Sequence, residues 1–124
     1  MYLLSDQRFG RAVALPALDA DALPQPLVPP ATTGGLVNPG AICLDWQGCL
    51  HIADAGNGRV VSLALATGTW TSFGAGTLGT VIGVAVDGGG RIHAANREKL
   101  FRADGRLEPY GPALGDFPPS RRNL

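Results

Sequence analysis

Two histidines are the side chains of this sequence best suited to acid–base or metal chemistry, and they stand at matching places in two similar segments. His51 and His93 are the only histidines and lie 42 positions apart. A neutral imidazole binds divalent metals and exchanges protons near neutral pH, but a zinc site needs three or four converging ligands. The favoured interpretation is therefore packing or hydrogen bonding within a sheet, with metal binding as the alternative.

Carboxylates accompany both histidines at the same spacing. Asp45 and Asp87 each precede a histidine by six positions, and the four residues together form the candidate metal-ligand set. A second set of polar residues occupies matching positions in these two segments and in an earlier one: Asp54, Asn96 and Asp6. An aspartate at a turn accepts hydrogen bonds from the backbone amides that follow it, and Arg11 and Arg59 stand where they can pair with the second set. We favour these structural roles, so we expect no cofactor, and a divalent metal stays the alternative.

Aromatic and basic residues are the candidates for contact with a partner. Packing between sheets is the favoured role of Trp46 and Trp70, although Trp46 lies in a predicted turn where an indole can reach a ligand. Basic residues crowd the last third of the chain: Arg91, Arg97, Lys99, Arg102, Arg106, Arg121 and Arg122. A solvated rim is their favoured interpretation. Arg97, Lys99 and Arg102 are the candidate contacts for a partner such as RNA.

Motifs for other chemistry fail on their context. GAGTLG at 74–79 has the glycine spacing of a dinucleotide-binding loop, but TVIGVAVD follows it as a strand. No helix N-terminus is then present to receive a phosphate. The four serines lie in no GxSxG motif, and neither histidine sits in a nucleophile–base pattern. The sequence therefore gives no support to hydrolase chemistry.

The two cysteines flank a predicted turn. If Cys43 faces His51 across the strand pair, Cys43 and Cys49 sit diagonally, about 7 to 8 Å apart at Cα, which is beyond the usual disulfide range. Their spacing also differs from that of a CxxC redox or zinc pair. We therefore predict two reduced thiols.

Length and charge set broad bounds. The chain has 124 residues, with ten acidic and ten basic side chains. It is long enough for one compact domain, and its balanced charge does not indicate a disordered tail or nucleic-acid binding through net charge. No stretch approaches the roughly 18 apolar residues of a membrane span, and the start lacks the pattern of a signal peptide. We expect a cytoplasmic protein, with a virion as the alternative location.

Internal repeats predict the fold class. A shift of 42 positions aligns 42–54 with 84–96 without a gap, and a shift of 48 aligns 4–15 with 52–63. A period of roughly 40 to 50 residues is typical of the four-stranded blades of a β-propeller. We therefore predict an all-β fold of antiparallel β-propeller blades. Because propellers close with about 4 to 8 blades, the ring in one chain is expected to be incomplete.

The predicted strands lie between glycine turns. In the best-defined blade they are 41–45, 49–53, 59–65 and 69–73, and in the next blade 83–87, 91–95, 99–103 and 107–110. An earlier partial blade has strands at 2–5 and 10–15. The expected organisation is a partial blade at 1–23, a Pro-rich linker or edge strand at 24–37, blades at 38–79 and 80–111, and a tail at 112–124.

The segment NPGAICLDWQGCLHIADAGNGRVVSL resembles an NHL repeat. The residues that carry the resemblance are Pro39, Gly40, Asp45, Gly48, Ala53, Asp54, Gly56, Asn57, Arg59 and Val60. The next blade keeps a smaller set: Gly83, Val84, Asp87, Gly90, Ala95 and Lys99. It lacks the Gly-Asn-x-Arg turn. The resemblance covers about 38–111 well and 2–15 faintly, and it implies a propeller that is commonly six-bladed. Two or three copies of the chain would then complete the ring, and the alternative is that the sequence is a fragment of a longer protein or a degraded copy.

A blade framework without a complete catalytic site leads us to expect a non-enzymatic recognition or scaffolding module. It would close its ring as a homo-oligomer or with other propeller-completing chains, and would bind a partner protein, or RNA through its basic cluster, but no membrane. Two alternatives stay open. One is a propeller lyase or lactonase-type enzyme with a pocket shared between chains, which the resemblance to NHL-type amidating lyases implies through the paired histidines. The other is a structural component of a larger assembly such as a phage particle.

Overall fold

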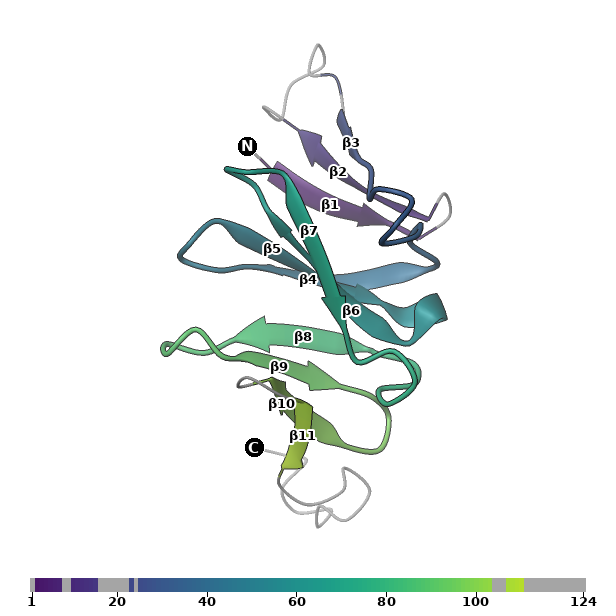
Figure 1. Cartoon of the computed structure of the whole chain (residues 1–124), viewed down its shortest axis with the longest axis vertical. Helices are drawn as coiled ribbons and strands as arrows, with labels where there is room; N and C mark the ends of the chain where they lie inside the picture. Colours follow the sequence, from purple (N-terminus) through teal and green to yellow (C-terminus); the bar gives the residue numbers. More distant parts are fainter. Residues whose placement is uncertain (1, 8–9, 16–22, 24, 104–106, 111–124) are drawn as a thin grey trace, which may run out of the picture.

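The chain folds as an all-β protein in a computed structural model. The structure describes residues 2–7, 10–15, 23, 25–103 and 107–110. Within these residues eleven strands form three antiparallel sheets, and the only helical segment is a 3-10 turn at Ala55–Asn57. The sheets follow one another along the long axis of the molecule (Figure 1), and none of them closes into a barrel. The predicted all-β fold of blade-like sheets in an incomplete ring is confirmed.

The first sheet has three described strands. They are β1 (Tyr2–Asp6), β2 (Arg11–Leu15) and β3 (Gln25–Leu27), in that order. β3 comes from the Pro-rich segment, for which the sequence left an edge strand or a linker open. Pro26 pairs with Val13 at the edge of the sheet, where a residue without an N–H to donate is tolerated.

The second sheet has four strands in sequence order. They are β4 (Pro39–Leu44), β5 (Cys49–Asp54), β6 (Arg59–Ala64) and β7 (Thr69–Phe73). Gly48 and Gly58 adopt left-handed backbone angles, with φ of 78° and 63°, in the turns before β5 and β6. Glycine suits such turns because it has no Cβ. β4 begins two residues before the predicted start, because Pro39 also pairs with Asp54 across an irregularity in the ladder.

The third sheet repeats this plan. Its strands are β8 (Gly83–Val86), β9 (Ile92–Ala95), β10 (Leu100–Ala103) and β11 (Leu107–Tyr110), again in sequence order. Three of these strands are one residue shorter at one end than predicted, and β11 has the predicted bounds. The predicted tail at 112–124 lies outside the described residues.

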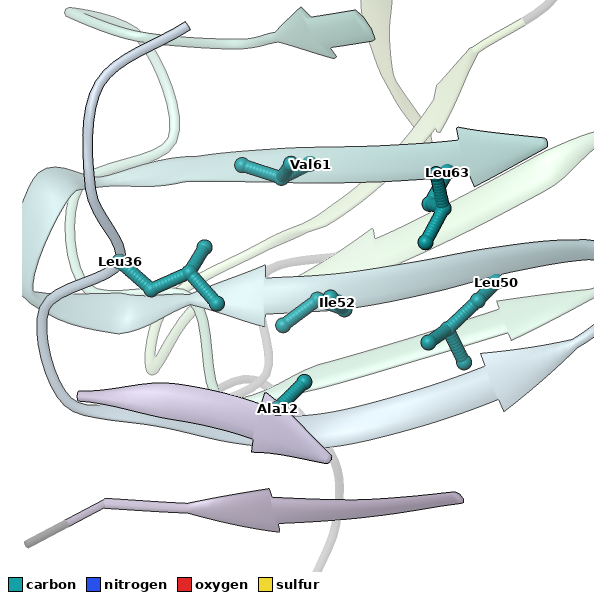
Figure 2. Close-up of a cluster of buried hydrophobic side chains, with 6 residues drawn as sticks. All are labelled: Ala12, Leu36, Leu50, Ile52, Val61 and Leu63. Carbon is teal, nitrogen blue, oxygen red and sulfur yellow. The ribbon is translucent and has the colours of Figure 1, made fainter. Parts of the chain in front are cut away.

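One face of the second sheet packs against the first sheet. The buried cluster at this contact, which we call the first joint, contains Ala12, Leu36, Leu50, Ile52, Val61 and Leu63 (Figure 2). Ile52 and Val61 are opposite one another on β5 and β6 and are fully buried. Burial of these apolar side chains is the main force that holds the two sheets together.

The opposite face of the second sheet packs against the third sheet. This second joint contains Ala53, Val60, Leu78, Val81, Ala94 and Phe101. Because consecutive side chains of a strand point to opposite faces, Ile52 and Ala53 serve different joints. Among the described residues, the second sheet is therefore covered on both faces, whereas the first and third sheets are each covered by it on one face.

The segments that connect the sheets enter the two joints in the same way. Leu36 and Leu78, 42 positions apart, are both buried at a joint. A Cβ at Gly10 would lie 2.9 Å from the carbonyl oxygen of Leu36, and a Cβ at Gly58 would lie 2.9 Å from that of Gly79. Both glycines also have positive φ angles, so any side chain would be strained there. The repeat thus includes the joints as well as the sheets.

Candidate functional site

An Asp–His pair lies at one end of the second sheet, on the face that packs against the third sheet. His51 Nε2 is 2.9 Å from Asp45 Oδ2, and His51 Nδ1 is 2.7 Å from Ser62 Oγ. The His51 residue is only 4% exposed. The three side chains form a hydrogen-bonded chain that ties together β6, β5 and the turn after β4.

The Ser62–His51–Asp45 chain corrects the expectation that neither histidine sits in a nucleophile–base pattern. Ser62 was missed because no local motif marks it. It meets His51 only because these residues are cross-strand partners on β5 and β6. The neighbouring cavity is not lined by His51 or Ser62, so a molecule bound there would not contact the serine. The arrangement therefore supports a structural role better than nucleophilic catalysis.

The third sheet repeats the pair. His93 Nε2 is 2.8 Å from Asp87 Oδ2, and Arg91 Nε also donates to that oxygen at 2.9 Å. The residue opposite His93 on β10 is Arg102, which replaces the serine of the second sheet. The side chain of His93 is 25% exposed, compared with 5% for His51. The two pairs thus differ mainly in how far a neighbouring sheet covers them.

Both aspartates also cap the turn that follows them. Asp45 Oδ1 accepts hydrogen bonds from the backbone N–H groups of Gln47 and Cys49, each at 2.9 Å. Asp87 Oδ1 accepts them in the same way from Gly89 and Arg91, at 2.9 and 3.0 Å. The turn-capping role favoured from the sequence is therefore present at both positions.

These contacts also shift the acidity of the two carboxyls. Burial by itself raises the pKa of Asp45, but the hydrogen bonds from His51 and the following amides hold it below its usual range. The pKa of Asp87 is lowered first by the hydrogen bond from His93 and then by the amide of Arg91. Both groups are therefore carboxylates at neutral pH.

The four candidate metal ligands form two separate Asp–His pairs rather than one cluster. In each pair the histidine Nε2 is engaged by the aspartate. The described part of the chain brings together no group of three or more His, Cys, Asp or Glu side chains that could hold a metal ion. A complete metal site from this set would need ligands from elsewhere.

Asp54, at the opposite end of β5, organises the entry into the second sheet. It is fully buried, and its carboxylate accepts hydrogen bonds from the backbone N–H of Val37 at 2.7 Å and from Arg59 Nε at 2.8 Å. Arg59 also donates to carbonyl oxygens of the segment 33–35. The predicted pairing of arginines with this set of carboxylates is present here and in the first sheet, where Arg11 lies 3.1 Å from Asp6.

Asn96 occupies the equivalent place in the third sheet. Its Oδ1 accepts hydrogen bonds from the backbone N–H groups of Glu98 and Lys99, and its Nδ2 donates to the carbonyl oxygen of Leu78 at 2.7 Å. The third sheet therefore keeps the hydrogen bond to its connecting segment, but it has no buried ion pair at this position.

Trp46 does not have the packing role between sheets that the sequence favoured. Its residue is 85% exposed in the β4–β5 turn, so it does not pack between sheets, whereas Trp70 packs at the first joint as predicted. A cavity of about 300 Å³ lies between this turn and the β8–β9 turn, lined by Asp45, Trp46, Gln47, Gly88, Gly89 and Gly90. Both turns lie on the same side of the molecule, at the left in Figure 1. Hydrogen bonds fix the local turn, and the indole is left at the surface because none of the three described sheets covers this end.

The three basic candidates do not share one setting. Arg97 and Lys99 are exposed in the β9–β10 turn, whereas Arg102 is a partly buried residue of β10. The three basic candidates therefore do not lie together on one exposed surface. Arg106, Arg121 and Arg122 of the basic cluster lie outside the described residues.

Cys43 and Cys49 are both free thiols. Cys43 pairs with His51 across β4 and β5, as the sequence predicted, so the two cysteines are diagonal neighbours. The prediction of two reduced thiols is confirmed.

Comparison with known proteins does not identify a family: neither the protein-family models nor the curated proteins include a significant match to this chain. The NHL resemblance therefore stays a prediction. Across the part of the chain that the structure describes, no helix is long and apolar enough to cross a membrane.

Proposed function

We propose that this protein is a non-enzymatic, NHL-like β-propeller module for recognition or scaffolding, whose ring is completed by other blade-bearing chains. The observation that carries the proposal is the use of its reactive side chains. His51, Ser62 and Asp45 hydrogen-bond to one another within one sheet, and the equivalent His93 bonds Asp87. Residue types that could perform chemistry thus stabilise the blades.

The surface around Trp46 is the proposed contact with a partner protein. An indole at 85% exposure beside a cavity of about 300 Å³ can be buried by a partner with a large gain in apolar contact. Tryptophan is enriched among the residues that dominate the energy of protein interfaces. The glycines of the facing turn, Gly88 to Gly90, leave the opposite wall of the cavity without side chains, so a partner side chain has room to enter.

The recognition role is tested by removing the indole. The wild-type chain, Trp46→Ala and Glu98→Ala are used to capture proteins from an extract of the source organism, with bound proteins quantified by mass spectrometry. Glu98 is exposed in a turn away from Trp46, so Glu98→Ala is the matched control. We expect one protein to bind in a fixed ratio to the wild type and to the control but not to Trp46→Ala. Equal capture by all three chains would contradict the proposal.

Metal binding separates the proposal from the lyase or lactonase alternative. Equilibrium dialysis against Zn²⁺ and against Ca²⁺ measures ions per chain for the wild type, His51→Ala and His93→Ala. We expect less than one ion per chain and no change in the variants, because each histidine already bonds an aspartate. One tightly bound ion per chain that is lost in either variant would favour the enzyme.

A further inference from the structure

Within the residues that the structure describes, the stack of three sheets ends in two faces against which no further sheet packs. The N-terminal end face is the side of the first sheet that carries Tyr2 and Leu4. It is opposite to the side that carries Leu3, which packs at the first joint, since side chains alternate along a strand. The C-terminal end face is the side of the third sheet that carries Ala95 and Leu100. These two residues are cross-strand partners.

The residues of the N-terminal end face occupy positions that are buried in the next sheet. A shift of 48 positions places Tyr2 on Leu50 and Leu4 on Ile52. Leu50 and Ile52 are 1% and 0% exposed at the first joint, whereas Tyr2 and Leu4 are 47% and 49% exposed. The first sheet thus presents the apolar side chains of a joint to which no described segment is docked.

The C-terminal end face shows the complementary half of a joint. Ala95 corresponds to Ala53 by the shift of 42, and Leu100 corresponds to Val60, because each is the cross-strand partner of that alanine. Ala53 and Val60 are fully buried at the second joint. Ala95 and Leu100 are only partly buried.

The Asp–His pairs show the same difference in burial, and one of them lies on the C-terminal end face. His51 and Ala53 lie on one face of β5, and the third sheet covers that face. His93 and Ala95 lie on the matching face of β9. The aspartate and histidine side chains are 10% and 5% exposed in the covered pair, and 27% and 25% exposed in the uncovered pair. The uncovered pair has the geometry of the buried pair but lacks the sheet that shields it.

We propose that the C-terminal end face of one copy packs against the N-terminal end face of a second copy, as a third joint of the kind found twice within the chain. This inference rests on the proposed role as a module completed by other blade-bearing chains, and it commits to a second copy as the occupant. The reason is that the chain carries both halves of the joint, each in the position where the internal repeat uses it.

The proposed contact is head-to-tail. Different faces of two identical chains form it, so the assembly closes into a ring if the rotation allows and otherwise grows as a filament. Because each chain carries three sheets among its described residues, two chains would supply six, within the range of about 4 to 8 blades that closes a propeller.

The test blocks one face at a time. Leu4→Glu places a carboxylate on the N-terminal end face, and Ala95→Glu places one on the C-terminal end face. An unpaired charge at a joint is strongly unfavourable, so each variant alone should run at the chain mass of 12.8 kDa in light scattering. The wild type should form a discrete oligomer. Thr71→Glu is the matched control, because it places a carboxylate at an exposed position of β7 in the second sheet, outside both end faces, and should keep the oligomer.

Mixing the two variants provides the decisive measurement. Each retains the face that the other has lost, so an equimolar mixture should form a one-to-one dimer of twice the chain mass and grow no further. Formation of this dimer also shows that both variants are folded. A monomeric wild type, variants that still associate, or a mixture that stays monomeric would each overturn the inference.

These outcomes are separable from failure of the proposed function. If the mixed dimer forms but Trp46→Ala captures partners as well as the wild type, the assembly stands and the recognition role fails. If the wild type is monomeric while Trp46-dependent capture persists, the recognition role stands, and the blades that complete the ring belong to another chain.

Discussion

The second and third sheets share one plan but differ in their surroundings. Each has an Asp–His pair at one end with closely similar geometry, at 2.9 and 2.8 Å. The second sheet packs against a neighbour on both faces, and its histidine side chain is 5% exposed. The third sheet packs against a described neighbour on one face, and its histidine side chain is 25% exposed.

This comparison shows that the hydrogen bonds of a blade do not depend on its neighbours, whereas the burial of those bonds does. A buried polar group that loses its partner costs more than an exposed one, because water cannot replace the lost hydrogen bond. Matching substitutions in the two sheets should therefore have unequal effects, and the difference measures how much the neighbouring sheet contributes.

The largest difference in stability is expected between Asp54 and Asn96, which lie at the C-terminal ends of β5 and β9. Asp54→Ala removes the carboxylate from the buried Arg59, and leaving a charge without its buried partner typically costs about 3 to 5 kcal/mol. Asn96→Ala, its counterpart in the third sheet, removes only neutral hydrogen bonds and should cost about 1 kcal/mol. Urea unfolding of both variants checks this. Equal losses would mean that the ion pair adds nothing beyond its hydrogen bonds.

A smaller contrast is expected between Ile52→Ala and Leu4→Ala, which are matched by the repeat. Ile52 is fully buried at the first joint, so its truncation should destabilise the fold by about 3 kcal/mol. Leu4 is 49% exposed, and its truncation should cost less than about 1 kcal/mol within one chain. Urea unfolding of both variants in a background that carries Ala95→Glu, which is expected to be monomeric, gives both free energies from the midpoint and the slope. If Leu4→Ala cost as much as Ile52→Ala, the described chain would already bury this face.

The two histidines should differ by less. His51→Ala removes the hydrogen-bond partner of Asp45 Oδ2 and of Ser62 Oγ, at a cost of about 2 kcal/mol. His93→Ala acts at a partly exposed site and should cost roughly 1 kcal/mol or less. In the Leu4→Glu chain, which is expected to be monomeric, diethyl pyrocarbonate should also modify His93 faster than His51, as followed by mass spectrometry of the peptides. Faster modification of His51 would reverse the assigned order of exposure.

The smallest effect concerns acid stability. The pKa of Asp45 is lower in the folded chain than in the unfolded chain, so acidification protonates the unfolded state first. The stabilisation from this group is present above about pH 4, the ordinary aspartate range, and is lost as the pH falls towards the lowered value. Asp45→Asn should therefore show a shallower loss of thermal stability below pH 4 than the wild type. An identical pH profile would mean that the folded state does not stabilise this carboxylate.

Local patterns predicted the strands well. Glycine turns and apolar alternation placed β7 and β11 at their observed bounds, and the spacing of Asp45 and Asp87 predicted their hydrogen bonds to following amides. Such contacts join residues a few positions apart, so sequence reasoning reaches them. The same reasoning missed Ser62, because its contact with His51 depends on the pairing register of β5 and β6.

Trp46 was also placed wrongly by the favoured interpretation. A tryptophan near a strand end is apolar enough to pack, and only the arrangement of the sheets shows that no described segment covers Trp46 in the β4–β5 turn. The reverse holds for Asp54, whose complete burial follows from the segment that folds over it rather than from its neighbours along the chain.

The sequence by itself determined the repeated strands, the turns and the matching Asp–His positions, because these follow from short-range spacing and from the conformational freedom of glycine. The tertiary structure decided which of the repeated positions are buried. Burial depends on which sheet lies against which face, and equivalent residues such as His51 and His93 have different neighbours in space although they have the same neighbours in the repeat.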